Sequence, residues 1–388
     1  GNPKLGGIYL QVSLVVLSGV SVIVFIAWNC TEQVWVAFGS NADIAADAGY
    51  YARILSLSIP AQVLFGQVSQ YFSAQRIMNP EVHSSLFALG LNLLFGFMFV
   101  LGVGIPNFNG FGFTACPIVT TLVAYIQIIV LYVVYIRIQQ LHKTCWNDAW
   151  DWNEITYPRI KTFCQLYFPA ALGTASDFWR VAVIGAVAAK LGEEQVAIFN
   201  TSYRIMWIVL TAVNSMATAS GINISIRLGK LNAMGAKQAG HVGAYMSLVF
   251  LLLVFGLVVR NIRALGRIFT NDASFLDSFE ETKWPFSITL LLMNLSVAIE
   301  KIPYSMGRTT IVFWMGCIAS WGAQVPAVLF LTTYWRDDLM GLYSGMAIGY
   351  FVLVVLYSAI AFTSDWHKYA RIAYDRSETS TENNTTSL

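Results

Sequence analysis

The seven residues Phe38-Gly39-Ser40-Asn41-Ala42-Asp43-Ile44 decide how this chain is organised, because a close copy of them begins 231 positions later. The copy, Phe269-Thr270-Asn271-Asp272-Ala273-Ser274-Phe275, keeps the Phe, the Asn or Asp, the Ala and the final apolar residue in place. A second pair follows the copies at nearly equal distance: Phe72-Ser73-x-x-Arg76 and Tyr304-Ser305-x-x-Arg308, with one residue of drift. This shared order and spacing predict an internal duplication.

The composition places the duplication in a membrane. Hydrophobic residues make up 56% of the 388 residues and charged residues only 11%, against about 25% charged residues in a typical soluble domain. These apolar runs are solid rather than alternating, and only helices and closed barrels span lipid. The predicted fold class is therefore an all-α, polytopic membrane protein. Ten runs are long enough to span, near 8–28, 50–71, 84–104, 115–136, 163–189, 195–226, 243–260, 286–307, 311–334 and 339–363.

The two copies divide these spans unequally. Spans one to four match spans seven to ten, so spans five and six form an opening pair that the first copy lacks. The chain also begins Gly1-Asn2-Pro3 rather than with Met. We therefore expect an N-terminal truncation of two spans from a protein of six plus six, since repeats with an even number of spans keep one orientation. The alternative is a natural ten-span protein whose first repeat has decayed.

Four segments follow from this division. Residues 1–136 are the predicted first lobe without its first two spans, 137–162 a cytoplasmic linker, 163–364 a second lobe of six spans, and 365–388 a disordered, polar tail. The linker holds Trp146, Trp150 and Trp152, and we expect it to lie against the membrane because Trp prefers the headgroup layer. Thirteen Lys and Arg residues fall on the side of the chain ends and six on the other, which predicts that both ends are cytoplasmic.

The residues disfavour several classes of function. The net charge of +2 follows from topology, so no nucleic-acid partner is expected. The chain has no Walker loop, zinc-ligand spacing or catalytic triad. A membrane enzyme would need clustered His, Cys or carboxylates within the spans, and the four His lie at span ends or in loops. We expect neither an enzyme nor a bound metal or cofactor.

Two acids well inside the predicted spans are the first candidates for function. A carboxylate in hydrocarbon is costly and usually faces a cavity or a partner, which makes Asp177 and Glu300 candidate carriers of a proton or another cation. Arg180 lies three residues from Asp177 on the same helical face, so a neutralised structural pair is the alternative. Glu300 adjoins Lys301 near the end of its span, and its alternative is an interfacial or paired acid.

The sixth span carries a polar stripe along one face. Polar or small residues recur there at alternating steps of four and three, which places them on one side of a helix. The stripe either lines a water-filled cavity or packs against neighbouring helices through small and hydroxyl residues, and Arg204 and Asn214 favour the cavity. Its members are Asn200, Arg204, Trp207, Thr211, Asn214, Thr218, Gly221 and Ser225.

Aromatic side chains are plentiful near the two acids, among them Phe178, Trp179, Tyr203 and Trp207. An acid beside aromatic faces suits an organic cation, through charge and cation–π attraction. Ordinary packing is the alternative for such aromatic residues.

Four short motifs are spread along residues 1–364: Phe168-Pro169 followed by Asp177-Phe178-Trp179, Ser225-Ile226-Arg227-Leu228-Gly229, Gly307-Arg308 and Gly1-Asn2-Pro3-Lys4. Their order and spacing resemble the eukaryotic multidrug and toxic compound extrusion (MATE) family. The first motif is similar to the Pro and Glu-Trp-Trp element of that family's seventh span. Ser225-Ile226-Arg227-Leu228-Gly229 resembles the Ser-x-Arg-Val-Gly that closes its eighth span. Gly307-Arg308 resembles the Gly-Arg after its tenth span, and Gly1-Asn2-Pro3-Lys4 the Gly-Asn-Pro loop after its second.

The resemblance implies a two-lobed transporter with twelve expected spans, of which ten are present. It would export organic cations or other xenobiotics by alternating access, driven by a proton or sodium gradient rather than a cofactor. We expect a monomer in the plasma membrane or in a vacuolar or other internal membrane, with the bilayer and a small molecule as its only partners. Asp177 takes the place of the seventh-span acid that carries the coupling proton. The predicted substrate cavity contains Trp179, Arg180, Asn200, Tyr203, Arg204, Trp207, Thr211, Asn214 and Asn294.

The chain departs from the family pattern at two positions. Ala182 stands where the seventh span has a second acid, and Arg180 intrudes between. The tenth-span acid falls on Met293, beside Asn294, and Glu300 lies two turns away on the same face. Three other functions stay open: a related flippase, an exporter of organic anions or metabolites with Arg180 and Arg204 as ligands, and an inactive truncated transporter.

Overall fold

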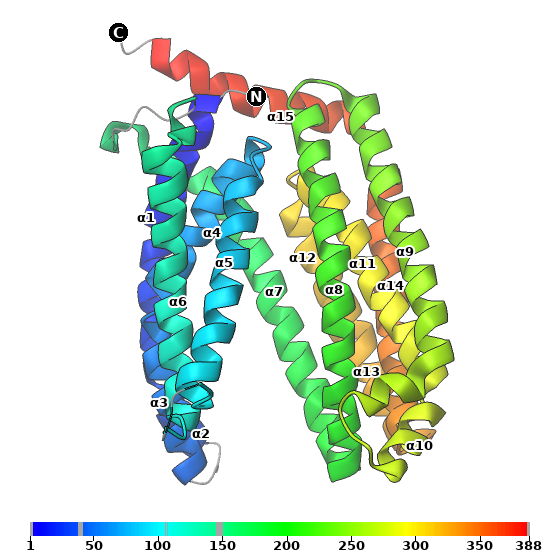
Figure 1. Ribbon diagram of the computed structural model, residues 1–388. Helices are drawn as coiled ribbons and strands as arrows, with labels where there is room; N and C mark the ends of the chain where they lie inside the picture. The colour runs from blue at the N-terminus through cyan, green and yellow to red at the C-terminus, as the bar shows by residue number, and fades with distance from the viewer. Residues whose placement is uncertain (1–2, 38–41, 105, 107, 145–149, 386–388) are drawn as a thin grey trace. The chain divides into compact units, whose positions relative to one another are not determined.

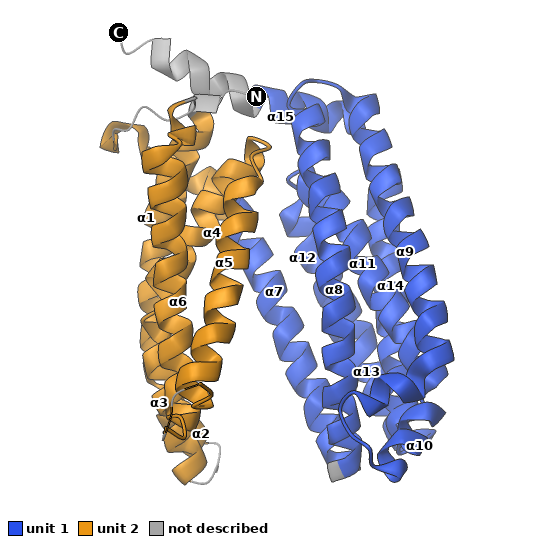
Figure 2. Cartoon of the chain, viewed as in Figure 1, with its two compact units in different colours: residues 1, 165–388 blue, residues 2–164 orange. Residues whose placement is uncertain are grey.

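A computed structural model of the chain describes residues 3–37, 42–104, 106, 108–144 and 150–385 (Figure 1). All regular elements in these ranges are helices. The chain separates into two compact units, residues 2–164 and residues 165–388 together with residue 1 (Figure 2). Phe38–Asn41 of the first repeat motif and Trp146 of the predicted linker lie outside the described residues.

Among its described residues, the unit of residues 2–164 contains six α-helices, the start of a seventh, two π-helices and three short 3₁₀-helices. In chain order these are α1 (Pro3–Asn29), α2 (Thr31–Ala37), α3 (Ala42–Ser56), α4 (Ile59–Ala74), α5 (Asn79–Phe95), η1 (Gly96–Val100), η2 (Gly112–Thr114), α6 (Ala115–Leu131), η3 (Tyr132–Ile138), η4 (Leu141–Thr144), η5 (Trp152–Glu154) and the start of α7 (Tyr157–Leu191).

The unit of residues 165–388 contains most of α7 and the helices that follow it. These are α8 (Glu193–Leu228), α9 (Ala233–Arg267), α10 (Ala273–Glu281), α11 (Lys283–Ser305), α12 (Thr309–Cys317), the π-helix η6 (Ile318–Gln324), α13 (Val325–Tyr334), α14 (Leu339–Thr363) and α15 (Trp366–Thr385). Its main hydrophobic core joins α8, α11 and α14 around Met206, Phe286, Leu290 and Tyr343.

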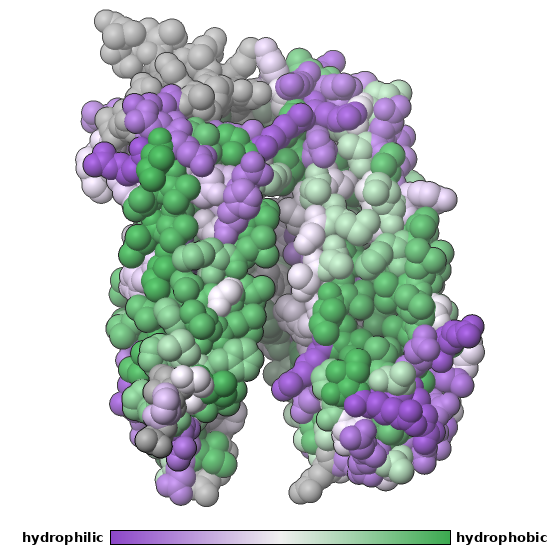
Figure 3. Space-filling model, in the orientation of Figure 1, coloured by the Kyte–Doolittle hydropathy of each residue, from purple (hydrophilic) through white to green (hydrophobic). Residues whose placement is uncertain are grey.

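Eight helical stretches among the described residues are long and apolar enough to cross a bilayer. On the face that Figure 3 shows, apolar side chains cover the middle of each unit and hydrophilic ones its ends. The eight stretches are Leu5–Asn29, Asn79–Val100, Gly112–Ile138, Glu194–Leu228, Ala233–Arg267, Lys283–Ser305, Thr309–Tyr334 and Leu339–Thr363.

Two predicted spans have a different form from the other eight. The run 50–71 is divided between α3 and α4, which have 15 and 16 residues. The break lies at Leu57–Ser58, just before Pro60, which cannot donate the next helical hydrogen bond. The run 163–189 lies within α7, which is 35 residues long and carries Asp177 and Arg180 among its apolar residues. The all-α membrane fold is confirmed. Of the ten predicted spans, the run 50–71 is broken into two helices and the run 163–189 carries charged residues, and these two are not among the eight stretches above.

Helix breaks reproduce the duplication that the sequence predicts. α1 ends at Asn29 and α2 begins at Thr31. Asn261 lies 231 positions after the intervening Cys30, and it interrupts α9 with φ −118° and ψ 23°. α3 begins at Ala42 and α10 at Ala273, which are again 231 positions apart. Both repeats therefore change helix direction at equivalent residues.

The helix ends that follow these breaks have the same backbone geometry. Arg76 after α4 has φ 65° and Gly307 after α11 has φ 76°. The amides of Ile77 and Arg308 donate to the carbonyls of Phe72 and Pro303, each at 3.0 Å. This is the Schellman arrangement that closes a helix with one left-handed residue. It pairs Arg76 with Gly307, so the backbone keeps the offset of 231 and removes the one-residue drift in the sequence match.

The predicted linker residues 150–156 include η5, whose N-cap is Asp151. The Asp151 side chain accepts from the Asn153 amide at 2.9 Å, and its own amide donates to Oε1 of Gln11 in α1 at 3.2 Å. The rings of Trp150 and Trp152 meet edge to face at 5.4 Å, and both are exposed. Exposed Trp side chains at this place are consistent with a segment in the headgroup layer.

The tail is helical where the sequence predicts disorder. α15 begins at Trp366, and Oδ1 of Asp365 accepts from the amides of His367 and Lys368 at its start. Trp366 and Ala370 are buried in a hydrophobic cluster with Ile224 and Leu228 of α8. This contact anchors the beginning of α15, which the polar composition of the tail does not indicate.

Small residues let α14 approach the α12–η6–α13 segment closely. A Cβ added to Gly345 would lie 2.5 Å from Cα of Val328, and one added to Gly349 would overlap the Gln324 side chain. Small residues four apart are a common way to bring membrane helices together. Because the contacts of Gly345 are with backbone atoms, the neighbouring helix cannot move aside there as a side chain would.

We predict that Gly345→Ala destabilises the protein by about 1–3 kcal/mol, the usual cost of overpacking. Gly256→Ala in α9 is the matched control, because a Cβ there meets no atom within 4 Å. It should leave stability unchanged or raise it slightly. Thermal unfolding of both variants in detergent micelles measures the difference, and equal midpoints would contradict the close α13–α14 contact.

Candidate functional site

Asp177 and Arg180 form an ion pair on one face of α7. Nη2 of Arg180 lies 3.1 Å from Oδ1 of Asp177, one helical turn away. The Arg180 side chain is 6% exposed, whereas that of Asp177 is 54% exposed. The carboxylate is therefore held by a guanidinium but is not sealed from its surroundings.

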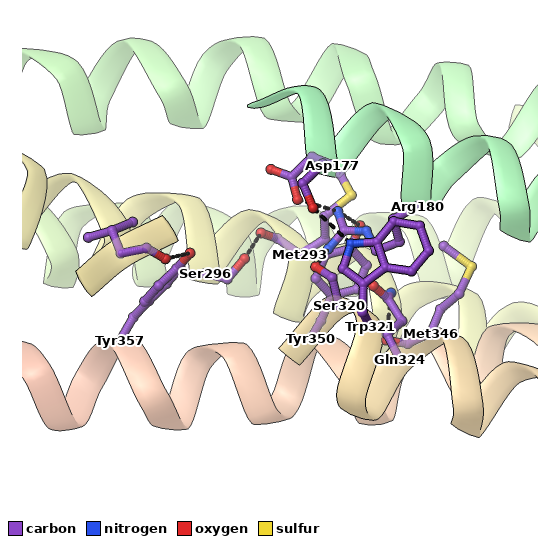
Figure 4. A network of polar contacts seen from close by, with 12 residues as sticks. Asp177, Arg180, Met293, Ser296, Ser320, Trp321, Gln324, Met346, Tyr350 and Tyr357 are labelled. Atoms are coloured by element: carbon purple, nitrogen blue, oxygen red, sulfur yellow. Dashed lines mark hydrogen bonds and ion pairs between the residues drawn. The ribbon is translucent and has the colours of Figure 1, made fainter. Parts of the chain in front are cut away.

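Arg180 is held from three sides (Figure 4). Nη1 donates to Oγ of Ser320 in η6 at 2.9 Å, and Nη2 donates to the hydroxyl of Tyr350 in α14 at 3.3 Å. Its Cζ lies 5.0 Å from the centre of the Tyr350 ring. A buried cation is stable only when charge and hydrogen bonds both compensate its lost hydration. Asp177, Ser320 and Tyr350 supply that compensation.

The π-helix η6 brings the α12–α13 segment to α7. Besides Ser320, it carries Trp321, whose Nε1 donates to Oγ of Ser176 at 2.8 Å. Gln324 at its end donates to the carbonyl of Met346 in α14 at 3.2 Å. π-Helical turns are rare and often occur at functional sites, because the extra residue redirects side chains. Here the turn aims two neighbouring polar residues at the Asp177 turn of α7.

A small pocket that is partly open to solvent brings Asp177 and Glu300 together. The two acids come from α7 and α11, and α12 and α14 supply the remaining walls. No Lys, Arg or His is among the lining residues, so the pocket is acidic and polar on one side and apolar on the other. The lining residues are Gly173, Ser176, Asp177, Glu300, Tyr304, Val312, Phe313, Gly316, Cys317 and Tyr357.

The two carboxylates differ in their partners. Asp177 is ion-paired, but among the described residues no Lys or Arg nitrogen lies within 4 Å of the Glu300 carboxylate. Glu300 is half-buried in α11 and lies within electrostatic range of Asp177 and Arg180. Glu300 is therefore the acid of the pocket that is free to exchange a proton or cation without first breaking an ion pair.

Several lining residues were not candidates from the sequence. Tyr304 belongs to the second repeat motif but carries no chemical signal there, and Ser176 and Cys317 are ordinary polar residues of a span. Tyr357 lies 180 positions from Asp177 in the chain, so no local spacing could connect the two. Only the packing of α14 against α11 and α12 places its hydroxyl at the pocket, where it donates to the carbonyl of Val312 at 3.4 Å.

The first part of the α8 stripe is exposed. Asn200, Arg204, Thr211 and Asn214 are exposed polar residues, and no ion pair of Arg204 occurs within the described ranges. Trp207 stacks with Phe178 of α7 at 6.3 Å and meets Tyr203 edge to face at 6.4 Å. The stripe therefore presents a polar face with three aromatic rings at its start.

The last part of the same stripe packs against α11. A Cβ added to Gly221 would lie 2.7 Å from Oγ of Ser305, and Oγ of Ser225 donates to the carbonyl of Ser305 at 3.2 Å. The packing interpretation therefore applies to the residues from Gly221 onward, which join two helices. The residues up to Asn214 are exposed within their unit, and a water-filled cavity beside them stays a prediction.

None of the nine residues predicted to form the substrate cavity is among those that line this pocket, and Asn294 and Trp179 lie clearly away from it. Asn294 is fully buried in α11, where its amide donates to the carbonyl of Leu290 at 2.8 Å. Trp179 is 61% exposed and is not among the lining residues, because it follows Asp177 by two positions and so points to the opposite side of α7. The periodicity that unites Ser176, Asp177 and Arg180 separates Trp179 from them.

The short basic motifs stabilise turns at one end of the unit. Nη1 of Arg227 donates to the carbonyl of Gly235 at 3.0 Å, across the α8–α9 turn. Nη1 of Arg308 donates to Oγ of Ser364 at 2.6 Å, and its Cζ lies 5.2 Å from the ring centre of Tyr369 in α15. These arginines therefore connect helix ends and do not belong to the pocket.

Comparison with known proteins places these features in a family. The MatE family model matches residues 1–98 and 169–329, which is more than half of the chain. Protein DETOXIFICATION 15 of Arabidopsis thaliana is 23% identical over 97% of this chain and 75% of its own length. Multidrug and toxin extrusion protein 1 of Danio rerio is 19% identical over 94% of this chain, which spans 61% of that protein.

Solved structures show the same fold. The crystal structure of the eukaryotic MATE transporter AtDTX14 superposes with a TM-score of 0.83 at 18% identity, covering 96% of this chain and 82% of that one. A transporter of the MOP superfamily from Pyrococcus furiosus, described as having a binding pocket of reversed polarity, gives a TM-score of 0.76 at 18% identity, covering 96% of this chain and 80% of its own.

We predict that Asp177→Asn and Arg180→Met are coupled in stability. Each single variant leaves one unpaired charge in the membrane-spanning region, whereas the double variant leaves none. The double variant should therefore be less destabilised than the sum of the singles by about 1–2 kcal/mol, a modest coupling because Asp177 is more than half exposed. Unfolding by SDS titration in mixed micelles measures this cycle, and additive effects would contradict the pair.

Proposed function

The chain belongs to the MATE family of membrane transporters, and on that premise we propose that it is a secondary active antiporter. It exports organic cations or other xenobiotic compounds in exchange for protons, or sodium ions, by alternating access. The single observation that carries the proposal is that Asp177 and Glu300, the two acids within the spans of their unit, line one pocket. Transporters bind coupling ions at such intramembrane carboxylates because these are otherwise too costly to retain.

The charge of the pocket supports a cation as its ligand. Two carboxylates and no basic residue line it, together with the hydroxyl groups of Ser176, Tyr304 and Tyr357. Intramembrane carboxylates serve in proton relays and in ion pathways, so the proposal includes both coupling ions. Protonation removes negative charge from the pocket and so weakens its attraction for an organic cation, which is the basis of exchange.

Exchange also requires two conformations with different affinities. A bound proton shifts the population toward the conformation that binds it better, and the organic cation shifts it back. Pocket residues come from α7, α11, α12 and α14, so a small change in their packing alters the distance between the acids. The energy comes from the ion gradient, so no bound cofactor takes part in this proposal.

The exposed part of α8 supports recognition of an organic cation. Trp207, Tyr203 and Phe178 present aromatic faces, and faces of this kind attract cations when little water intervenes. Asn200, Thr211 and Asn214 add hydrogen-bonding groups along the same helix. We include these residues in the substrate path, together with Arg204, as a proposal distinct from the coupling site.

An anion is the less favoured cargo. Arg180 and Arg204 would have to bind it, but Arg180 is buried and already bound to Asp177, Ser320 and Tyr350. Arg204 is exposed and is the remaining candidate. We propose a monomeric protein that works in the plasma membrane or an internal membrane, with both chain ends in the cytoplasm.

We predict that Asp177→Asn and Glu300→Gln each abolish exchange driven by an imposed pH gradient. Purified protein in liposomes is tested with a panel of monovalent organic cations, from tetraethylammonium to ethidium, and uptake is followed after a pH jump. Each variant loses one of the charges on which coupling depends, so uptake should fall to the level of empty liposomes.

The matched control is Asp337→Asn, an exposed acid in the connection between α13 and α14. It should retain wild-type uptake. Normal uptake by the Asp177→Asn variant would discard Asp177 from the coupling site, and normal uptake by the Glu300→Gln variant would reduce that residue to a structural role. Repeating the jump with sodium in place of protons distinguishes the two coupling ions.

Competition distinguishes a cation exporter from an anion exporter. We predict that excess organic cations inhibit uptake of a labelled cation at least tenfold more strongly than organic anions of the same size, because the pocket carries no basic residue. The opposite order of inhibition would favour the anion alternative and make Arg204 the residue to test next.

A further inference from the structure

Arg180 forms an ion pair with one of the two acids of the pocket, Asp177, and not with the other, Glu300. We propose that Arg180 is a built-in counter-cation that keeps Asp177 ionised throughout the cycle and confines proton exchange to Glu300. The inference rests on the proposed antiport, which it deepens by naming the acid that titrates and the number of protons that move.

The surroundings of Arg180 show that its charge is permanent. The guanidinium does not lose its proton in proteins, and its side chain is 6% exposed. Ser320 and Tyr350 accept from Nη1 and Nη2 with neutral oxygens, so neither can balance the charge, and Nε is buried without a hydrogen-bond partner among the described residues. Asp177 is the carboxylate in contact with it. Protonating Asp177 would leave a buried cation unbalanced, which low-polarity surroundings oppose.

The surroundings of Glu300 differ in this respect. The charged and titratable groups near it are Asp177 and Arg180 of α7, Lys301 and Tyr304 of its own helix, and Tyr357 of α14. Two of these groups, Arg180 and Lys301, are cations, and neither forms an ion pair with Glu300 within the described ranges. Tyr304 and Tyr357 line the pocket as neutral hydroxyls. Glu300 can therefore gain or lose a proton while the Asp177–Arg180 pair stays intact.

Charge balance then sets the stoichiometry. With Asp177 and Arg180 cancelling, the pocket is neutral when Glu300 is protonated and carries one negative charge when Glu300 has released its proton. A monovalent organic cation restores neutrality. One proton leaves as one monovalent cation binds, and neither loaded state places net charge in the membrane. If Asp177 titrated as well, the site would carry the one positive charge of Arg180 when both acids are protonated and one negative charge when both have released their protons, so two protons would move.

The charge of Arg180 also accounts for the expected failure of the Asp177→Asn variant. In that variant Arg180 loses its counter-ion within electrostatic range of Glu300. The unpaired guanidinium would then hold Glu300 ionised and prevent its protonation. Loss of transport in this variant would come from the freed Arg180 charge and not from the loss of a proton carrier. Removing that charge should therefore restore transport.

The test is a rescue experiment in liposomes, with the organic cation of the panel that the wild-type protein exchanges fastest. We expect Asp177→Asn to lose exchange and the double variant Asp177→Asn/Arg180→Met to recover at least a tenth of the wild-type rate. The matched control is Asp177→Asn/Arg180→Lys, which keeps the charge and should stay inactive. Glu300→Gln should remain inactive in the wild-type and in the rescued background.

A second measurement is independent of folding of the variants. The wild-type equilibrium for a monovalent cation should not change when a membrane potential is imposed with potassium and valinomycin, because one positive charge moves each way. A shift of this equilibrium that corresponds to one net charge crossing the membrane in each exchange would show that two protons move. That result would overturn the inference.

The outcomes separate the two proposals. An active wild-type protein whose double variant stays inactive while folded, as judged by its unfolding midpoint, would overturn the role of Arg180 and leave the antiport in place. Recovery in the Arg180→Lys variant as well would overturn it too, because rescue would not depend on charge. A wild-type protein that exchanges no member of the panel would overturn both.

Discussion

The ion pair between Asp177 and Arg180 is the interaction on which the second unit is organised. A guanidinium that is almost fully buried in a membrane-spanning bundle is costly unless an anion and oriented hydroxyl groups surround it. Here the anion comes from the same helix, and the hydroxyls come from Ser320 of η6 and Tyr350 of α14. The charge therefore ties α7 to two other elements, and these elements include walls of the pocket.

The close packing of α14 has the same effect from the other side. Gly345 and Gly349 bring the backbone of α14 against α13 and η6. This close contact fixes the positions of Tyr350 and Tyr357 relative to those elements. Tyr350 then contacts Arg180, and Tyr357 lines the pocket that Glu300 shares. Small residues, a π-turn and a buried charge thus act together. None of the three alone would place a carboxylate of α7 beside one of α11.

The two repeats share their backbone geometry but differ in the side chains at equivalent positions. Both repeats break and close their helices at residues 231 positions apart, with a left-handed residue at Arg76 in one and at Gly307 in the other. The position of Glu300, one turn before the end of α11, corresponds to Ser69 in α4, which is buried. The backbone is repeated, whereas the acid is present in the second repeat only.

The sequence by itself determined the membrane setting, the helical class, the duplication and the two acids, because each depends on composition or on spacing within one helix. It also identified Arg180 as a neighbour of Asp177, since three residues make one turn. Only the tertiary structure decided which residues meet across helices: Tyr357 and Tyr304 join the pocket, Asn294 is buried away from it, and the α8 stripe divides into an exposed half and a packed half. The start of the tail depends on tertiary structure in the same way, because Trp366 and Ala370 are anchored by a cluster of distant residues. Periodicity describes the face of a single helix, but the partner of that face depends on how helices far apart in the chain pack together.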